Sequence, residues 1–204
     1  MLDSHIEING NLMSKPPHLR FFKSFLALSL SLFLLIHLAF PKGTAQAASS
    51  RAYVIKAGFI YNFTRFIKWP SPSKFDGNEY NICVLGDNPF GSILERLEEK
   101  HRFKERPLKI KLDVSRSDFR GCHILFVSFS ERFNIEKIVE QTKNFQVLTV
   151  GDTEGFAERG IDINLLVADN KVKFEISKQC LDRKRFKVSS ELYDLATIVR
   201  GGCQ

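Results

Sequence analysis

The first long pattern after residue 50 is a run of apolar residues at helical spacing. Over residues 53–69, apolar side chains recur every three or four positions, which predicts an α-helix. These side chains are Ile55, Phe59, Phe63, Phe66 and Ile67. Pro70 and Pro72 end the pattern. Apolar residues lie on nearly every face, so we expect this helix to be deeply buried or to contact a partner.

Strands and amphipathic helices alternate after this helix. Apolar runs predict strands over residues 80–85, 108–114, 123–129 and 145–150, and helical spacing predicts helices over 90–100 and 131–143. The run HILFVSF at 123–129 is apolar almost throughout. Such a run is typical of a central strand that is covered on both faces.

The C-terminal part predicts a hairpin followed by a helix. Strands over 161–167 and 171–176 are joined at Asp169-Asn170, a turn dipeptide. An amphipathic helix is predicted over 189–199, capped by Ser189 or Ser190. The order of elements predicts the α/β class: one domain with a mostly parallel sheet, an antiparallel hairpin extension and helices on both faces.

The N-terminal segment has the features of a secretory signal peptide. Residues 25–40 are almost wholly apolar, basic residues precede them, and Ala45-Gln46-Ala47 follows. The run of 16 residues is shorter than the roughly 20 that span a bilayer. We therefore predict a signal peptide at 1–47, one domain at 48–204, and export to the periplasm without stable membrane insertion after cleavage. The alternative is an uncleaved N-terminal anchor.

The chain is basic, but its predicted export changes what that net positive charge indicates about its partners. Lys and Arg total 30 against 23 Asp and Glu, a formal net charge of +7. A basic balance usually indicates nucleic acid as a partner. An exported protein does not meet nucleic acid in the cytoplasm, so we do not expect it as a partner.

All four cysteines, at positions 83, 122, 180 and 203, lie in the predicted mature chain. An oxidising compartment permits two disulfides, with three alternative connectivities. Cys83 and Cys122 lie on or beside apolar strands, where they could form a bridge or remain as buried thiols. No pair has the C-x-x-C spacing of a redox-active dithiol.

Catalytic patterns are weak. No phosphate-binding glycine loop or nucleophile elbow occurs, and His101 and His123 are the only histidines after residue 47. We therefore predict no metal site and no cofactor, and no group of residues stands out as a catalytic site. Asp87 and Asp152 follow two predicted parallel strands, where ligands bind in this fold class, but both also suit turns and helix caps. The basic stretch 178–187 reads either as a solvated helix end and loop or as an anion or partner contact.

Six segments together resemble the YfiR-like family of periplasmic regulators over residues 52–199. They are AYVIKAGFIYNFTRFIKWP, YNICVLGDNPFG, GCHILFVSFS, FQVLTVGD, VKFEIS and VSSELYDLATIV. The resemblance implies a compact Rossmann-like domain that is not an enzyme. It also implies a repressor that binds the periplasmic sensor domain of an inner-membrane diguanylate cyclase with a GGDEF domain. Repression would lower cyclic di-GMP and biofilm formation.

The resemblance also implies roles for single residues. Cys83 and Cys122 match a family disulfide; a second family pair falls in 157–164, where this chain has no cysteine. Cys180 and Cys203 could form a different, second bridge. The segment linked to repression contains Glu175, Leu181 and Ser190, with Glu175 expected on an edge hairpin and exposed apolar residues expected around Leu181. Lys187 and Ser189 align with a region of small-ligand contact.

Two other functions compete with this interpretation. The protein could be a periplasmic small-molecule sensor for another membrane receptor, such as a histidine kinase or a transporter. It could also be an exported enzyme that uses Asp87 and Asp152. The phenylalanines of the first helix are consistent with a homodimer, and equally with a well-filled core.

Overall fold

The computed structural model describes residues 43–70, 78–103, 106–112, 114–115, 119–200 and 202–203. Residues 1–42, which hold most of the predicted signal peptide, lie outside this part of the chain. Ala45–Gln204 cluster into one compact unit, which is the unit described below.

Helix α2 (Gly43–Phe66) is longer than the sequence pattern predicts. It begins ten residues before position 53, because the alanine-rich stretch 44–52 holds no helix breaker and favours the helical state. It ends at Phe66, and the next two residues form the short strand β1 (Ile67–Lys68). Ala57, Ile60 and Phe63 are fully buried, whereas Val54 and Ile55 are about half exposed. The expectation of deep burial is therefore confirmed for the face that carries Ala57, Ile60 and Phe63, but not for Ile55 or Phe66, which is 40% exposed.

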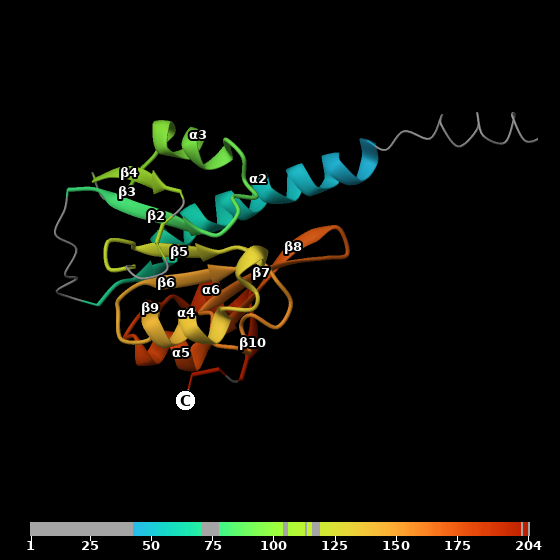
Figure 1. The fold of residues 1–204 in the computed structure, drawn as a ribbon. Helices are drawn as coiled ribbons and strands as arrows, with labels where there is room; N and C mark the ends of the chain where they lie inside the picture. Colours follow the sequence, from blue (N-terminus) through green and yellow to red (C-terminus); the bar gives the residue numbers. More distant parts are fainter. Residues whose placement is uncertain are drawn as a thin grey trace, which may run out of the picture. The chain divides into compact units, whose positions relative to one another are not determined.

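Eight strands form the main sheet, in the order β10-β8-β7-β6-β5-β2-β4-β3 (Figure 1). Their bounds are β2 Tyr80–Leu85, β3 Arg102–Phe103, β4 Arg106–Lys111, β5 Ile124–Val127, β6 Leu148–Gly151, β7 Ile163–Ala168, β8 Lys171–Ser177 and β10 Thr197–Val199. All neighbours are parallel except β7–β8 and β3–β4. The predicted α/β class, with a mostly parallel sheet and an antiparallel hairpin, is confirmed.

Helices cover both faces of this sheet (Figure 1). One apolar cluster joins the sheet to α2, α3 (Ile93–Lys100), α5 (Lys178–Arg183) and α6 (Ser190–Asp194). A second cluster joins the opposite face to α4 (Ile135–Thr142). Successive strand residues alternate between the clusters, as Val84 and Leu85 do, because side chains along a strand point to opposite faces.

Two sequence-based boundaries are wrong in an informative way. The predicted helix over 189–199 is only α6, and its last residues instead form β10, which pairs in parallel with β8. The predicted helix over 131–143 is split into a 3₁₀ turn, Phe129–Glu131, and α4. In the first case the unpaired edge of β8 offers hydrogen-bond partners that outweigh helical spacing. The hairpin turn at Asp169-Asn170 is confirmed, with both residues at positive φ.

Candidate functional site

The carboxyl ends of β2 and β5 lie where the chain reverses the direction in which it builds the sheet. After β2 the chain passes through α3 to β4 on one side, and after β5 it passes through α4 to β6 on the other. Ligands of open α/β sheets bind at such a point. Here Ser130 Oγ accepts a hydrogen bond from the backbone N–H of Asp87 at 2.9 Å. A Cβ atom at Gly86 would overlap Ser130 Oγ, so the hydroxyl fills this gap between the strand ends.

Asp152, just after β6, is bound by side chains of helix α2. Its Oδ2 accepts hydrogen bonds from Lys56 Nζ at 3.0 Å and from the Tyr53 hydroxyl at 2.8 Å. The Lys56 and Asp152 side chains are only 6% and 3% exposed. Burial, followed by the Asp152 charge, raises the pKa of Tyr53, so its hydroxyl remains a donor. This buried group fastens α2 to the carboxyl end of β6, inside the sheet, and gives Asp152 a structural role. Asp87 is exposed.

Glu175 lies in a row of residues that crosses four strands at this end of the sheet. Gly151, Asn164, Glu175 and Thr197 are register partners across β6, β7, β8 and β10. Asn164 Nδ2 donates to Glu175 Oε2 at 3.0 Å and to the carbonyl of Thr153 at 2.8 Å. Glu175 is therefore linked through Asn164 to the loop that begins at Asp152.

The expectation that Glu175 lies on an edge hairpin is wrong. Strand β8 has β7 on one side and β10 on the other, and Glu175 is half-buried between them. The error has the same cause as the missed strand: the residues after α6 were assigned to a helix, which left β8 without a second neighbour.

The other residues of the predicted repression segment differ in exposure. Leu181 is completely buried in the core, so the expectation of an exposed apolar position is wrong there. Ser190, the first residue of α6, is exposed. The exposed apolar side chains of this region are instead Leu195, at 73%, and Ile198, at 44%.

The two residues predicted to contact a small ligand lie next to each other near α6. Lys187 is exposed on the short strand β9 (Lys187–Val188), opposite Lys68 of β1. Ser189 caps α6, and its hydroxyl accepts a hydrogen bond from the backbone N–H of Leu192 at 3.3 Å. Its own N–H donates to the carbonyl of Phe66 at 2.9 Å, which ties α6 to the end of α2.

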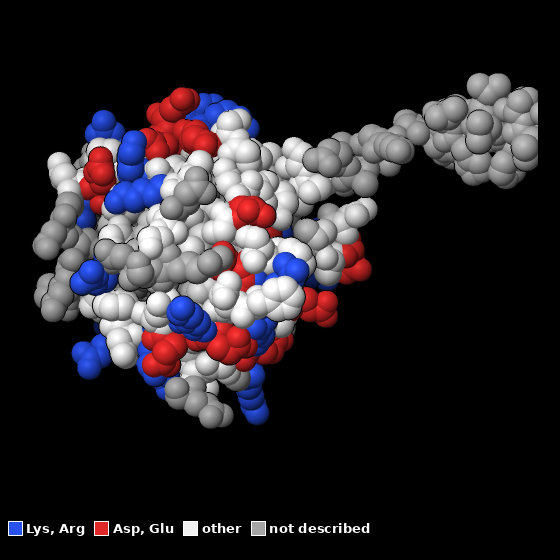
Figure 2. Space-filling model, in the orientation of Figure 1, with Lys and Arg blue, Asp and Glu red and all other residues white. Residues whose placement is uncertain are grey.

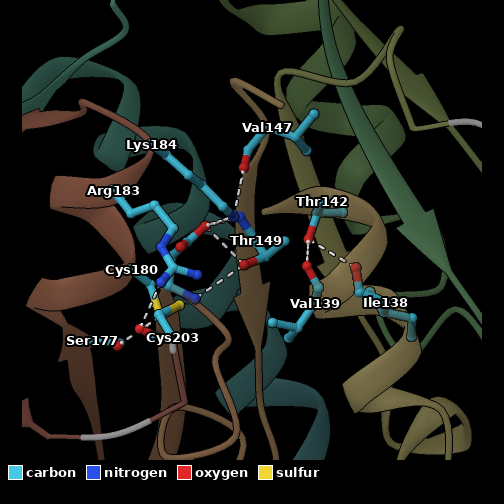
Figure 3. Close-up of a disulfide and its surroundings, with 11 residues drawn as sticks. Ile138, Val139, Thr142, Val147, Thr149, Ser177, Cys180, Arg183, Lys184 and Cys203 are labelled. Atoms are coloured by element: carbon cyan, nitrogen blue, oxygen red, sulfur yellow. Dashed lines mark hydrogen bonds and ion pairs between the residues drawn. A yellow bond between two sulfur atoms is a disulfide. The ribbon is translucent and has the colours of Figure 1, made fainter. Parts of the chain in front are cut away.

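The structure contains two disulfides, Cys83–Cys122 and Cys180–Cys203. The first joins β2 to the residue two positions before β5, within the cluster that faces α4. The second joins α5 to the C-terminal tail (Figure 3). Ser177 Oγ lies 2.9 Å from Cys180 Sγ, and Arg183 donates to the carbonyl of Cys203 at 3.1 Å.

Sequence reasoning missed a buried ion pair beside the second disulfide. Lys184 Nζ donates to Asp162 Oδ2 at 2.6 Å. It also donates to the Val147 carbonyl at 3.2 Å (Figure 3). Asp162 Oδ2 also accepts hydrogen bonds from the N–H and the hydroxyl of Thr149. The side chains of Lys184 and Asp162 are 3% and 0% exposed. One lysine of the basic stretch 178–187 is thus inside the protein, although that stretch is also compatible with a solvated helix end and loop. No local sequence pattern indicates that Lys184 is the buried one.

Sequence reasoning also missed an exposed aromatic pair after β5. Phe129 and Phe133 are 56% and 80% exposed, and the Arg132 guanidinium lies 4.3 Å from each ring centroid. Phe133 falls within the helix predicted over 131–143, but it lies between the 3₁₀ turn and the first residue of α4, so no helix turns its ring toward the core. On the face drawn in Figure 2, positive and negative side chains are interspersed among uncharged surface.

Two general observations concern the described part of the chain. It holds no cluster of three or more His, Cys, Asp or Glu side chains that could bind a metal ion. None of its helices combines the length and the apolar character that a membrane span requires.

A family model described as YfiR/HmsC-like matches residues 53–197, which include every element from the middle of α2 to the first residue of β10. A search of curated proteins gives no match.

Proposed function

Because the chain belongs to the YfiR/HmsC-like family, we propose that it binds the periplasmic sensor domain of an inner-membrane GGDEF diguanylate cyclase and represses it. Family membership implies a periplasmic regulator of diguanylate cyclase rather than a catalyst. In this proposal the protein is not an enzyme, and repression lowers cyclic di-GMP and biofilm formation. The observation that carries the proposal is the family match across residues 53–197.

Two features of the molecule support an extracytoplasmic regulator. Both disulfides suit an oxidising compartment such as the periplasm. The buried Lys56–Asp152 pair occupies a sheet end where an α/β enzyme would place catalytic groups. Its carboxylate is used to hold α2, which favours a binding role for this scaffold over a catalytic one.

The partner surface that we propose lies around β8, β10 and α6. Glu175 supplies a half-buried carboxylate at its margin, Ser190 an exposed hydroxyl, and Leu195 and Ile198 supply exposed apolar area. Leu181 would act from inside, by holding α5 in the core beneath this surface. Lys187 lies in the adjacent strand β9 and Ser189 caps α6, where a small ligand could adjust the same surface.

Repression then requires a difference in affinity. A bound regulator shifts the cyclase only if it binds the inactive arrangement more tightly than the active one. A charge at the margin of the interface contributes to the choice of partner and to its orientation. Reversing the charge of Glu175 should therefore weaken repression more than removing that charge.

The test is cellular cyclic di-GMP in a strain that lacks the gene, complemented with wild-type protein or variants. We expect the deletion to raise cyclic di-GMP and the wild-type gene to restore it. Glu175→Lys should fail to restore it, while Glu175→Gln, which keeps an acceptor for Asn164, should restore it in part. Glu99→Lys, a charge reversal at an exposed position of α3, is the matched control and should restore it fully.

Equal abundance of all variants in the periplasm must accompany these measurements. Full repression by Glu175→Lys at normal abundance would contradict the proposed surface. No rise on deletion would contradict the repressor itself and would favour a sensor for another receptor.

A further inference from the structure

The turn between β5 and α4 places two phenylalanine rings in solvent. Phe129 and Phe133 are 56% and 80% exposed, and Arg132, which lies between them in sequence, is half-buried. Rings left in water forgo the free energy that burial of an aromatic side chain provides. Apolar groups that gather at one place on a surface mark an interaction site, whereas single scattered ones do not. These three residues, the aromatic–arginine cluster, therefore have the composition of an interaction site.

The two rings orient the guanidinium of Arg132. It lies 4.3 Å from the centroid of each ring, within the range of a cation–π contact, and donates to the Phe129 carbonyl at 3.4 Å. No ion pair joins it to a carboxylate in the part of the chain that the structure describes. A guanidinium carries five N–H donors in a planar fork, which matches a carboxylate in two places. The cluster thus offers an oriented cation whose counterpart is a carboxylate from another molecule.

Polar contacts around the cluster hold its backbone in one arrangement. Ser130 Oγ accepts a hydrogen bond from the Asp87 N–H at 2.9 Å, which links the turn to the end of β2. Glu131 is 2% exposed and accepts a hydrogen bond from Asn134 Nδ2 at 3.0 Å, just before α4 begins. A surface that is already ordered loses little conformational entropy when a partner binds. The cluster is therefore preorganised for binding.

The exposure and the charge of this region select the kind of partner. Small molecules bind in concave pockets, but Phe133 projects from the surface and fits a pocket in a macromolecule. Two exposed carboxylates lie close by: Asp87 beside Ser130, and Glu136 in the first turn of α4. These carboxylates repel an anionic membrane surface. The observations therefore favour a protein that carries a carboxylate next to an apolar pocket.

The cluster lies at the same end of the sheet as Glu175. Val127, the last residue of β5, is the register partner of Gly151. The row that crosses Gly151 continues to Glu175 on β8. Three strand spacings separate β5 from β8 in the sheet, a distance of about 14 Å. A single partner domain is large enough to cover the cluster and Glu175 together.

We propose that the aromatic–arginine cluster is a second contact for the cyclase sensor domain, in which Phe133 fills an apolar pocket and Arg132 pairs with a carboxylate beside that pocket. This inference rests on the proposed function. With a carboxylate at Glu175 and a guanidinium at Arg132, the partner has to present a cation and an anion in the matching order. Such complementary charges fix the orientation in which two proteins bind.

The first experiment identifies the neighbour of Phe133 in cells. Phe133 is replaced by the photoreactive analogue p-benzoylphenylalanine in the full chain, and the cells are irradiated. We expect a cross-link to a membrane protein with a GGDEF domain, identified by mass spectrometry. Phe145 is the matched control, because it is 40% exposed and precedes β6 at the opposite end of the sheet, and the same analogue there should give no such cross-link. Cross-links from position 133 to lipid alone, or to proteins without a GGDEF domain, would overturn the proposal.

The second experiment measures binding and repression by substituted proteins. Arg132→Glu and Phe133→Ala should each bind the purified sensor domain of the cross-linked cyclase roughly tenfold or more weakly, as loss of a central interface residue does. In the deletion strain, both should leave cyclic di-GMP above the level that the wild-type gene restores. The controls are Phe145→Ala and Lys100→Glu, a charge reversal at the exposed end of α3, and both should match the wild type.

The outcomes separate this contact from the repressor function. Suppose that deletion of the gene raises cyclic di-GMP, while Arg132→Glu and Phe133→Ala restore repression fully at normal periplasmic abundance. The contact is then overturned and the repressor function stands. No rise on deletion would contradict the repressor function itself, and this contact with it. Binding of the wild type, but not of Phe133→Ala, to vesicles of phosphatidylethanolamine and phosphatidylglycerol would replace the protein partner by a membrane and overturn the proposal.

Discussion

The central strands and the C-terminal segment of this protein are stabilised in different ways. In β5 and β6 every residue is buried, and the two apolar clusters cover these strands from both faces. From α5 to β10 the elements are two to six residues long, and β10 is mostly exposed. A buried ion pair, a helix cap and a disulfide hold this second region. Stability is therefore spread over many contacts in the centre and concentrated in a few at the C-terminal end.

The largest expected effect comes from breaking the Lys184–Asp162 pair. Lys184→Met leaves the Asp162 carboxylate buried without its cation, and such a change costs about 3–5 kcal/mol of unfolding free energy. The control is Lys178→Met on the same helix, which removes the exposed pair with Asp182 and should cost far less, because water and salt screen that pair. Urea unfolding measures both. If both variants lost the same free energy of unfolding, the buried Lys184–Asp162 pair would not be the main contact that holds this region.

A smaller effect is expected in the centre as the pH falls. His123, just before β5, is 4% exposed, packs on Tyr80 and accepts a hydrogen bond from the Asn81 N–H at 3.0 Å. Burial, with the charges of Arg106 and Lys111, lowers the pKa of His123 to about 4. The unfolded chain binds a proton near pH 6.5 and the folded chain does not. The stability from this group is present above pH 6.5 and is lost as the pH falls toward 4, by at most about 3 kcal/mol.

The measurement is urea unfolding at pH 7.5 and pH 4.5. His123→Asn removes the titrating ring and retains an acceptor for Asn81, so its stability should fall less over this interval than that of the wild type. Protonation of the carboxylates changes the unfolding free energy of both proteins equally. The difference between the two pH dependences therefore reports on His123. An identical pH dependence in the two proteins would show that His123 does not titrate in this way.

The smallest effect concerns the cap of α6. Ser189→Ala removes the acceptor for the Leu192 N–H and should lower stability by about 1 kcal/mol. Ser189→Asp, which can also cap a helix, should keep most of that stability. Loss of ligand response in both variants, with stability lost only in the alanine variant, would separate ligand contact from capping. No loss of stability in Ser189→Ala would show that the cap does not hold this region.

The central strands were predicted well from the sequence, and the C-terminal segment was not. The apolar runs at β2, β5 and β6, the turn at Asp169-Asn170 and the α/β class were all predicted, because each depends on periodicity or local backbone preference. Strand β10 was missed, since a strand at that position depends on β8, about twenty residues earlier in the chain. The burial of Leu181 and Lys184 was missed for a related reason: the elements that cover them are distant in sequence.

By itself, the sequence determined the alternation of strands and helices, the central position of β5, and the resemblance to a family that the match over residues 53–197 confirms. These properties follow from side-chain spacing and short motifs, which a linear chain displays directly. Only the tertiary structure decided that Cys180 pairs with Cys203, that Lys184 lies inside against Asp162, and that Glu175 has a strand on each side. Each of these is a contact between segments far apart in the chain, and its free energy exists only once the sheet has brought those segments together.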